Sequence, residues 1–143
     1  MLGAADELQA HGVFVDAQVS RQMKDYLPTI QDAQTRGLLG DTIIVHLGTN
    51  GSFSNETLST FMDALRGVPR VIVLTSYADR GWVDDNNAKL MALPAGYPNV
   101  TILDWHQLAT QCPGDCFYDD GIHLNQNGQN YYASLVLAAG QVP

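Results

Sequence analysis

Asp120 and His123 could together form a general base. They stand three residues apart in the run Asp119-Asp120-Gly121-Ile122-His123. In a turn, the Asp120 carboxylate can accept the N–H of one imidazole nitrogen, fix the tautomer and stabilise the protonated ring. The other nitrogen of His123 is then free to take a proton. A loop histidine that only caps the following helix is the alternative.

Asn50 is a candidate oxyanion donor. It follows the apolar run 42–47, in Gly48-Thr49-Asn50-Gly51. An asparagine just after a central strand can aim its NH₂ group at a developing negative charge. The alternative is a turn residue, because Asn-Gly is common in turns. Together with the Asp120–His123 pair, Asn50 favours chemistry in which a base and an oxyanion donor cooperate.

The familiar nucleotide, metal and serine-hydrolase motifs do not occur in this chain. There is no GxGxxG after a strand-like run, no GxxxxGK followed by Ser or Thr, and no GxSxG. The four histidines (His11, His46, His106 and His123) form no HxH or HExxH pair. We therefore expect no cofactor and no metal; a metal site built from residues distant in sequence is the alternative.

Two cysteines enclose a short turn. Pro113-Gly114-Asp115 separates Cys112 from Cys116, and Pro-Gly favours a turn that brings the sulfur atoms together. The spacing does not match the paired CxxC motifs of zinc sites. We predict a small disulfide loop and hence an oxidising compartment. Two free thiols in a cytosolic protein are the alternative.

The composition limits the partners. The chain has 143 residues and a net charge of −8, which disfavours nucleic acid because phosphate binding needs a basic face. No apolar run approaches the roughly 20 residues of a membrane helix. Residues 1–7 lack the basic and apolar regions of a signal peptide. The length suits one domain that spans residues 1–143.

Short β-branched runs alternate with segments of helical periodicity. The predicted strands are 13–15, 42–47, 71–74 and 100–103, and the predicted helices are about 2–11, 23–37, 54–67, 84–91 and 125–140. Pro28 should start or kink the second helix. This order predicts an α/β domain whose mostly parallel sheet has helices on both faces. Ligands bind at the carboxyl ends of such strands, which is where segment 16–22 and Asn50 stand.

These segments resemble the SGNH hydrolase superfamily, and within it the extracytoplasmic domain attached to membrane acyltransferases that O-acylate bacterial surface polysaccharides. Run 45–51, Val-His-Leu-Gly-Thr-Asn-Gly, resembles the third conserved block, and run 119–124, Asp-Asp-Gly-Ile-His-Leu, resembles the fifth. Trp82 and Asn87 also fit the pattern of this subgroup. The resemblance implies a three-layer, flavodoxin-like fold. It also implies that Asn50 belongs to the oxyanion hole and that Asp120 and His123 belong to a catalytic triad.

The sequence departs from this family at two places. Run 16–22 resembles the second block, but Ser20 stands where a glycine usually supplies an oxyanion-hole N–H, so the tight glycine conformation is in question. The first block, a strand that ends in Gly-Asp-Ser, is missing, and Met1-Leu2-Gly3 resembles the residues that follow it. We therefore expect an N-terminally truncated domain that lacks its central strand and its nucleophile.

The resemblance implies a serine esterase or O-acyltransferase at the bacterial cell surface. Its substrate would be an acylated carbohydrate or a small ester, and its partner an upstream membrane acyltransferase domain. Two alternatives remain. One is a non-catalytic carbohydrate- or partner-binding module on the same scaffold, in which Trp82, Trp105 and Tyr77 could stack on sugars, although core packing is the role we favour for them. The other is an unrelated flavodoxin-like flavin or signalling module, although no phosphate-binding first loop is visible.

Overall fold

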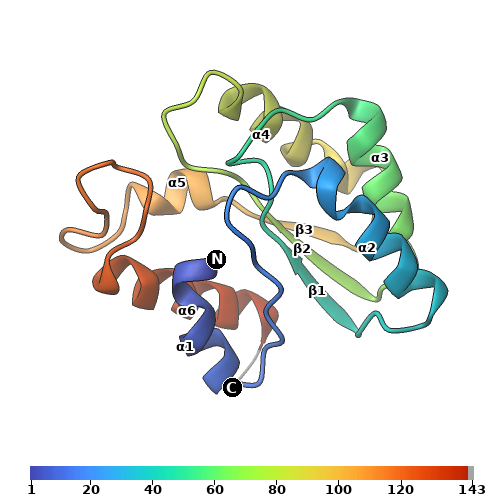
Figure 1. Cartoon of the computed structure of the whole chain (residues 1–143), viewed down its shortest axis with the longest axis horizontal. Helices are drawn as coiled ribbons and strands as arrows, with labels where there is room; N and C mark the ends of the chain where they lie inside the picture. Colours follow the sequence, from blue (N-terminus) through green and yellow to red (C-terminus); the bar gives the residue numbers. More distant parts are fainter. Residues whose placement is uncertain (142–143) are drawn as a thin grey trace.

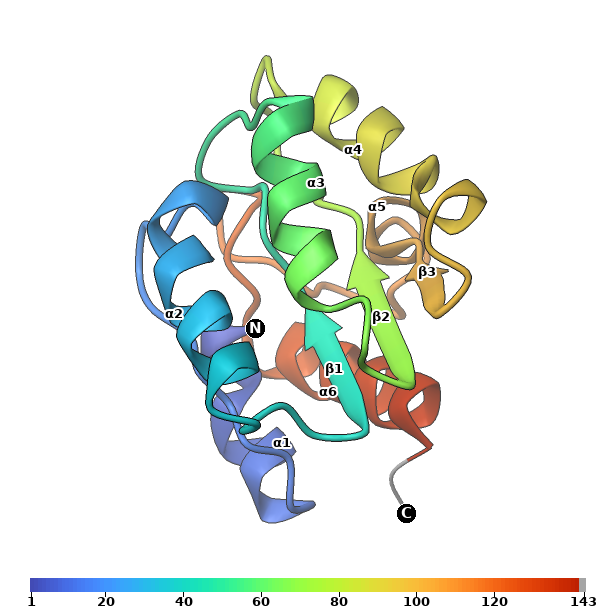
Figure 2. The same ribbon diagram turned by 90° about the vertical axis from the view of Figure 1, so that its right-hand side faces the viewer.

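The fold centres on a parallel sheet with helices on both faces. The computed structural model describes residues 1–141. Its strands are β1 (Thr42–Val45), β2 (Arg70–Leu74) and β3 (Val100–Leu103), which lie in the order β1-β2-β3 (Figures 1 and 2). Both strand pairs are parallel, with Val45 opposite Val73 and Leu74 opposite Leu103. The predicted α/β class is confirmed, with three strands in the sheet.

The helices form two layers. One layer contains α2 (Met23–Thr35), α3 (Asn55–Ala64), α4 (Val83–Met91) and the 3-10 turn η2 (Leu93–Ala95), and the other contains η1 (Leu2–Ala4), α1 (Ala5–Ala10), α5 (Trp105–Ala109) and α6 (Gln126–Gly140). In Figure 2, α2 and α3 lie on one side of the sheet and α1 and α6 on the other.

Alternation along β2 explains why both layers are needed. Val71 and Val73 pack with α2, α3 and α4, whereas Ile72 and Leu74 pack with α1, α5 and α6. All four side chains are buried, as a parallel strand covered on two faces requires. The predicted three-layer arrangement therefore follows from side chains that point to opposite faces at successive positions.

The predicted strand 13–15 was wrong. These residues are extended but join no strand ladder; the Val13 N–H instead closes the end of α1 on the Leu8 carbonyl. Within the described residues, β1 pairs with β2 alone, so its other edge carries no hydrogen-bonded strand. A β-branched run becomes a strand only beside a partner, and segment 13–15 has none.

Three helical details differ from expectation. Segment 2–11 divides into η1 and α1. Pro28 lies inside α2, which starts earlier through a capping box between Gln22 and Asp25. Helix α5 was not predicted, because its apolar residues are few and its start depends on Asp104 as the N-cap. The predicted last helix is confirmed, with Asn125 as its N-cap. Within the described residues, no helix is both long and apolar enough to cross a membrane.

Burial at the centre of the sheet yields a prediction about stability. Leu74 is fully buried and touches the layer that contains α6. Leu74→Ala should lower the free energy of unfolding by about 2–5 kcal/mol, because it removes packed methyl groups and leaves a cavity. Met91→Ala is the control, since that side chain is 51% exposed and should cost under about 0.5 kcal/mol. Urea unfolding of both variants measures the difference, and equal losses would contradict this account of the core.

Candidate active site

The candidate residues meet at one large cavity. It has a volume of about 1250 Å³ and follows β1 to the loops at the carboxyl end of the sheet. Ser20, Asn50 and His123 all line it. They come from segments far apart in the sequence, which the parallel sheet and α6 bring to the same place. Asp120, the fourth predicted site residue, does not line the cavity but contacts His123.

The Asp120–His123 pair has the geometry of an oriented base. His123 Nδ1 lies 2.6 Å from Asp120 Oδ2, and the other carboxylate oxygen accepts the backbone N–H groups of Ile122 and His123, each at 2.9 Å. The bond from the imidazole, supported by these two amides, lowers the pKa of Asp120 to about 2. Asp120 is therefore an anion at neutral pH, and His123 Nε2 remains available to take a proton.

A short hairpin carries this pair. Phe117 and Leu124 form an antiparallel bridge, and the Tyr118 N–H donates to the His123 carbonyl at 2.8 Å. Gly121 has φ 65°, the left-handed conformation that the turn requires and glycine adopts without strain. The hairpin is thus closed at its base, and its tip presents both side chains to solvent beside the cavity.

Ser20 keeps the backbone conformation that was in question. Its φ is 60°, so serine occupies the left-handed region that glycine would favour. Within residues 1–141, the Ser20 N–H donates to no other backbone group. Asn50 Nδ2 reaches the Arg21 carbonyl at 3.3 Å, which brings the amide side chain next to this turn. The turn can therefore offer one backbone donor and the Asn50 side chain a second.

Segment 16–26 is held beside the cavity by contacts among one acidic, one basic and one aromatic side chain. The Asp16 carboxylate accepts from Arg21 Nη1 at 2.8 Å and from the Tyr26 hydroxyl at 2.8 Å. The Arg21 guanidinium also stacks over the Tyr26 ring at 4.5 Å. The bond from Arg21 lowers the pKa of Asp16, so the pair stays charged over the neutral range. These contacts fix the loop that presents Ser20.

Asn86 holds the loop that carries Asn50, and sequence reasoning missed it. Its fully buried amide donates to the Gly48 and Gly51 carbonyls and accepts from the Phe53 N–H. Burial of an asparagine is not visible in a polar run, so the sequence offered no signal. Asn87 does the same for the next loop, with bonds to the Ser76 N–H and carbonyl.

Core packing, the role favoured for Trp82, Trp105 and Tyr77, is confirmed for Trp105. Trp105 is 4% exposed and packs edge-on against Tyr132. Its ring face is therefore not available to stack on a sugar. Tyr77 packs against His106 and Phe117. Trp82 is half-buried and donates to the Thr49 carbonyl. The exposed aromatic side chains at the cavity are instead Phe14 and Tyr118.

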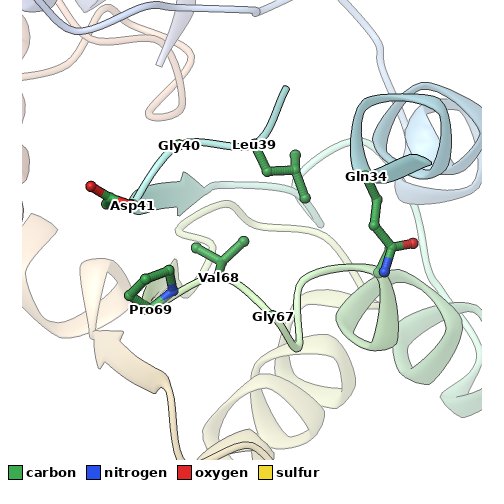
Figure 3. Close-up of a pocket in the computed structure, with 8 residues that line it drawn as sticks. Gln34, Leu39, Gly40, Asp41, Gly67, Val68 and Pro69 are labelled. Atoms are coloured by element: carbon green, nitrogen blue, oxygen red, sulfur yellow. The ribbon is translucent and has the colours of Figure 1, made fainter. Parts of the chain in front are cut away.

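A second cavity lies at the other end of the sheet and offers no comparable chemistry. It has a volume of about 370 Å³ and lies where the chain enters β1 and β2 (Figure 3). Asp41 is the one charged residue among those that line it, and backbone and apolar groups make up most of the rest.

Hydroxyl and metal partners for His123 are absent from the described part of the chain. Over residues 1–141, no serine or threonine hydroxyl hydrogen-bonds His123. The same range contains no group of three or more His, Cys, Asp or Glu residues that could hold a metal ion. Cys112 and Cys116 are joined in a disulfide. The site thus contains an imidazole oriented by Asp120, beside a cavity that Ser20 and Asn50 also line.

The sheet, its two helical layers and the loops at its carboxyl edge define an SGNH-like α/β domain. The C-terminal catalytic domain of *Streptococcus pneumoniae* peptidoglycan O-acetyltransferase A has this fold, with a TM-score of 0.84 over 98% of this chain and 87% of that one, at 23% identity. An α/β hydrolase, LAE5, from a lake metagenome gives a TM-score of 0.71 at 16% identity, over 97% of this chain and 81% of that one. No family model matches the chain.

Sequence comparison identifies the relatives more closely. The chain is 31% identical over 124 residues, 87% of its length, to the peptidoglycan O-acetyltransferase OatA of *Listeria monocytogenes*. It is 28% identical over 127 residues, 89% of its length, to the putative peptidoglycan O-acetyltransferase YrhL of *Bacillus subtilis*. The chain spans 20% of the length of each relative. It is therefore homologous to one segment of the OatA-type proteins, which confirms the predicted resemblance.

The lowered pKa of Asp120 yields a prediction about acid stability. A carboxyl whose pKa is about 2 in the folded chain and 3.8 otherwise stabilises the fold above pH 3.8. This contribution is lost as the pH falls toward 2. Asp120→Asn should therefore flatten the acid side of the stability profile, measured as urea midpoints between pH 5 and 2. Asp119→Asn, which removes the same charge one residue away, is the control; identical profiles for the two variants would refute the assignment.

Proposed function

We propose that this chain forms the base and oxyanion part of an SGNH-type serine esterase or O-acyltransferase. The observation that carries the proposal is the 2.6 Å contact between His123 and Asp120 beside a cavity that Ser20 and Asn50 also line. An oriented imidazole and two convergent donors serve a reaction in which a hydroxyl attacks a carbonyl. The homology to OatA-type proteins supports the same class of chemistry.

The proposed reaction follows from these positions. A serine Oγ forms a bond to the ester carbonyl carbon while its proton passes to His123 Nε2, and Asp120 stabilises the resulting imidazolium. The Ser20 N–H and Asn50 Nδ2 stabilise the negative carbonyl oxygen. The bond to the leaving alcohol then breaks, and His123 returns the proton to that alcohol. A water or a sugar hydroxyl attacks the acyl-serine by the same steps and releases an acid or a new ester.

The serine needs a support, and the edge of β1 offers one. That edge borders the large cavity, whose walls include Val13, Val15, Ile44 and Tyr132. His46 Nε2 is buried without a partner in the same wall. Unpaired strand groups and apolar walls are what an added parallel strand would satisfy. We therefore propose that a strand bearing the serine occupies this cavity beside β1 in the active enzyme.

The relatives suggest the substrate and the place of action. OatA and YrhL are described as peptidoglycan O-acetyltransferases, which supports acetyl esters of a cell-surface polysaccharide as substrates of this chain. The Cys112–Cys116 disulfide supports an extracytoplasmic location, where such bonds persist. A membrane acyltransferase domain in the same protein is the partner we propose to supply the acyl group. The net charge of −8 weighs against nucleic acid.

A non-catalytic carbohydrate-binding module is the second candidate. The exposed side chain of Tyr118, which is 58% exposed and lines the cavity, favours it. The two candidates differ in one requirement, because only the enzyme needs a nucleophile within reach of His123. Tests of ester cleavage with and without an added serine strand therefore separate them.

The chain of residues 1–143 should be almost inactive by itself. Without a nucleophile, only the small acceleration from binding and the oxyanion donors remains. Hydrolysis of p-nitrophenyl acetate should stay within about tenfold of the rate with His123→Ala, followed by absorbance at neutral pH. Robust turnover that disappears in His123→Ala would contradict this, because a hydroxyl already present would then be the nucleophile.

A strand that ends in Gly-Asp-Ser, fused directly before Met1, should restore both stability and activity. A strand paired with the edge of β1 would form backbone hydrogen bonds worth about 0.5–1.5 kcal/mol each. The melting temperature should therefore rise by about 5 °C or more, and p-nitrophenyl acetate should be cleaved. The matched control replaces the serine of the added strand by alanine, which should keep the thermal gain and lose the activity. A stable fusion without activity would favour the binding module.

A further inference from the structure

The disulfide loop, residues 112–116, leads into the hairpin of His123 and packs against the start of α6. Cys116 is 2% exposed, and its carbonyl accepts the Asn125 N–H at 3.1 Å. Gly128 approaches the same carbonyl so closely that a Cβ there would stand 2.1 Å from the oxygen. The first turn of α6 therefore packs directly on the backbone of the loop.

Two asparagines tie the loop to the helix. Asn127 Nδ2 donates to the Pro113 carbonyl at 2.7 Å and to the Asp115 carbonyl at 3.2 Å, and it lies 3.2 Å from Cys116 Sγ. Asn125 Nδ2 donates to the carbonyls of Asp115 and Phe117. These bonds need the loop carbonyls to converge on α6.

The hairpin depends on this loop at its first strand. Phe117 follows Cys116 directly and pairs with Leu124. The next residue, Tyr118, is held by the hydrogen bond that its N–H donates to the His123 carbonyl. The second strand of the hairpin runs straight into the N-cap of α6. One side of the hairpin is thus anchored by the disulfide loop and the other by the helix. Separation of these two anchors would open the base of the hairpin.

We propose that Cys112, Cys116 and Asn127 are positioning residues. The Cys112–Cys116 disulfide and the Asn127 side chain hold the hairpin closed, so that Asp120 and His123 stay in contact. The disulfide keeps the loop carbonyls convergent, and Asn127 joins them to α6. None of the three residues touches the reacting atoms. A catalytic role for the Asp120–His123 pair rests on the proposed function. The positioning of the pair by the disulfide and Asn127 does not depend on that function.

The proposal makes the geometry of the pair dependent on redox state. A dithiol reductant attacks one sulfur, the S–S bond breaks through a mixed disulfide, and the reductant leaves as its own cyclic disulfide. The two cysteines gain two electrons and two protons as thiols. Cys112 is only half-buried, so a small dithiol can reach the bond. The loop then loses its covalent closure while the sheet is untouched.

The test measures the pKa of the Asp120 carboxyl by NMR titration of the 143-residue chain. The oxidised chain should give about 2. Reduction by dithiothreitol, or the double variant Cys112→Ser with Cys116→Ser, should raise this pKa toward 3.8, as the bonds from His123 and the backbone weaken. Asn127→Ala should act in the same direction with the disulfide intact. Asn130→Ala, an exposed asparagine one turn further along α6, should leave the value at about 2.

Hydrogen exchange of the β2 amides, read in the same samples, reports whether the fold survives. Protected β2 amides with a raised Asp120 pKa support the proposal. A pKa that stays near 2 after reduction overturns it, and so does loss of β2 protection, because the disulfide would then support the whole fold. Dithiothreitol should change nothing further in the double serine variant. An inactive serine-strand fusion with the titration result intact would count against the proposed function alone.

Discussion

The structure depends on β2 being buried on both of its faces. Its side chains alternate between two apolar clusters, so neither helical layer can be removed without exposing half of the strand. A parallel sheet covered in this way leaves its carboxyl edge as the place where polar loops can gather. That constraint explains why residues as distant in sequence as Ser20 and His123 line one cavity.

Loops at the carboxyl edge of the sheet carry backbone N–H and C=O groups that form no hydrogen bond within the sheet. Side chains of α4 form hydrogen bonds with several of these groups. Asn86 and Asn87 are adjacent, yet each serves a different loop, one after β1 and one after β2. Their amides replace the hydrogen bonds that water would otherwise supply. A loop fixed in this way can present Asn50 without the support of a strand. Hydrogen bonds from α4 therefore fix the loop that carries Asn50.

Much of the architecture could be predicted from the sequence, and the failures share one cause. Apolar runs identified β1, β2 and β3, and Asn125 marked the start of α6, because these signals are local. Segment 13–15 has the same composition as a strand but lacks a partner, and pairing is not a local property. The burial of Asn86 likewise depends on what packs over it. Asp120, His123, Asn50 and Ser20 could be grouped in advance only because their motifs resembled a known family.

The two halves of the candidate site are held by separate contacts. The oxyanion side is held by the Asn86 amide and by the Asp16–Arg21–Tyr26 cluster, both of which contact the layer with α2, α3 and α4. The base side is held by the hairpin, its disulfide loop and α6. The hairpin lies outside the sheet, and the Asp120 and His123 side chains at its tip are exposed. The hydrogen bonds that orient His123 are therefore local to its turn and share no partner with those that hold the loop of Asn50.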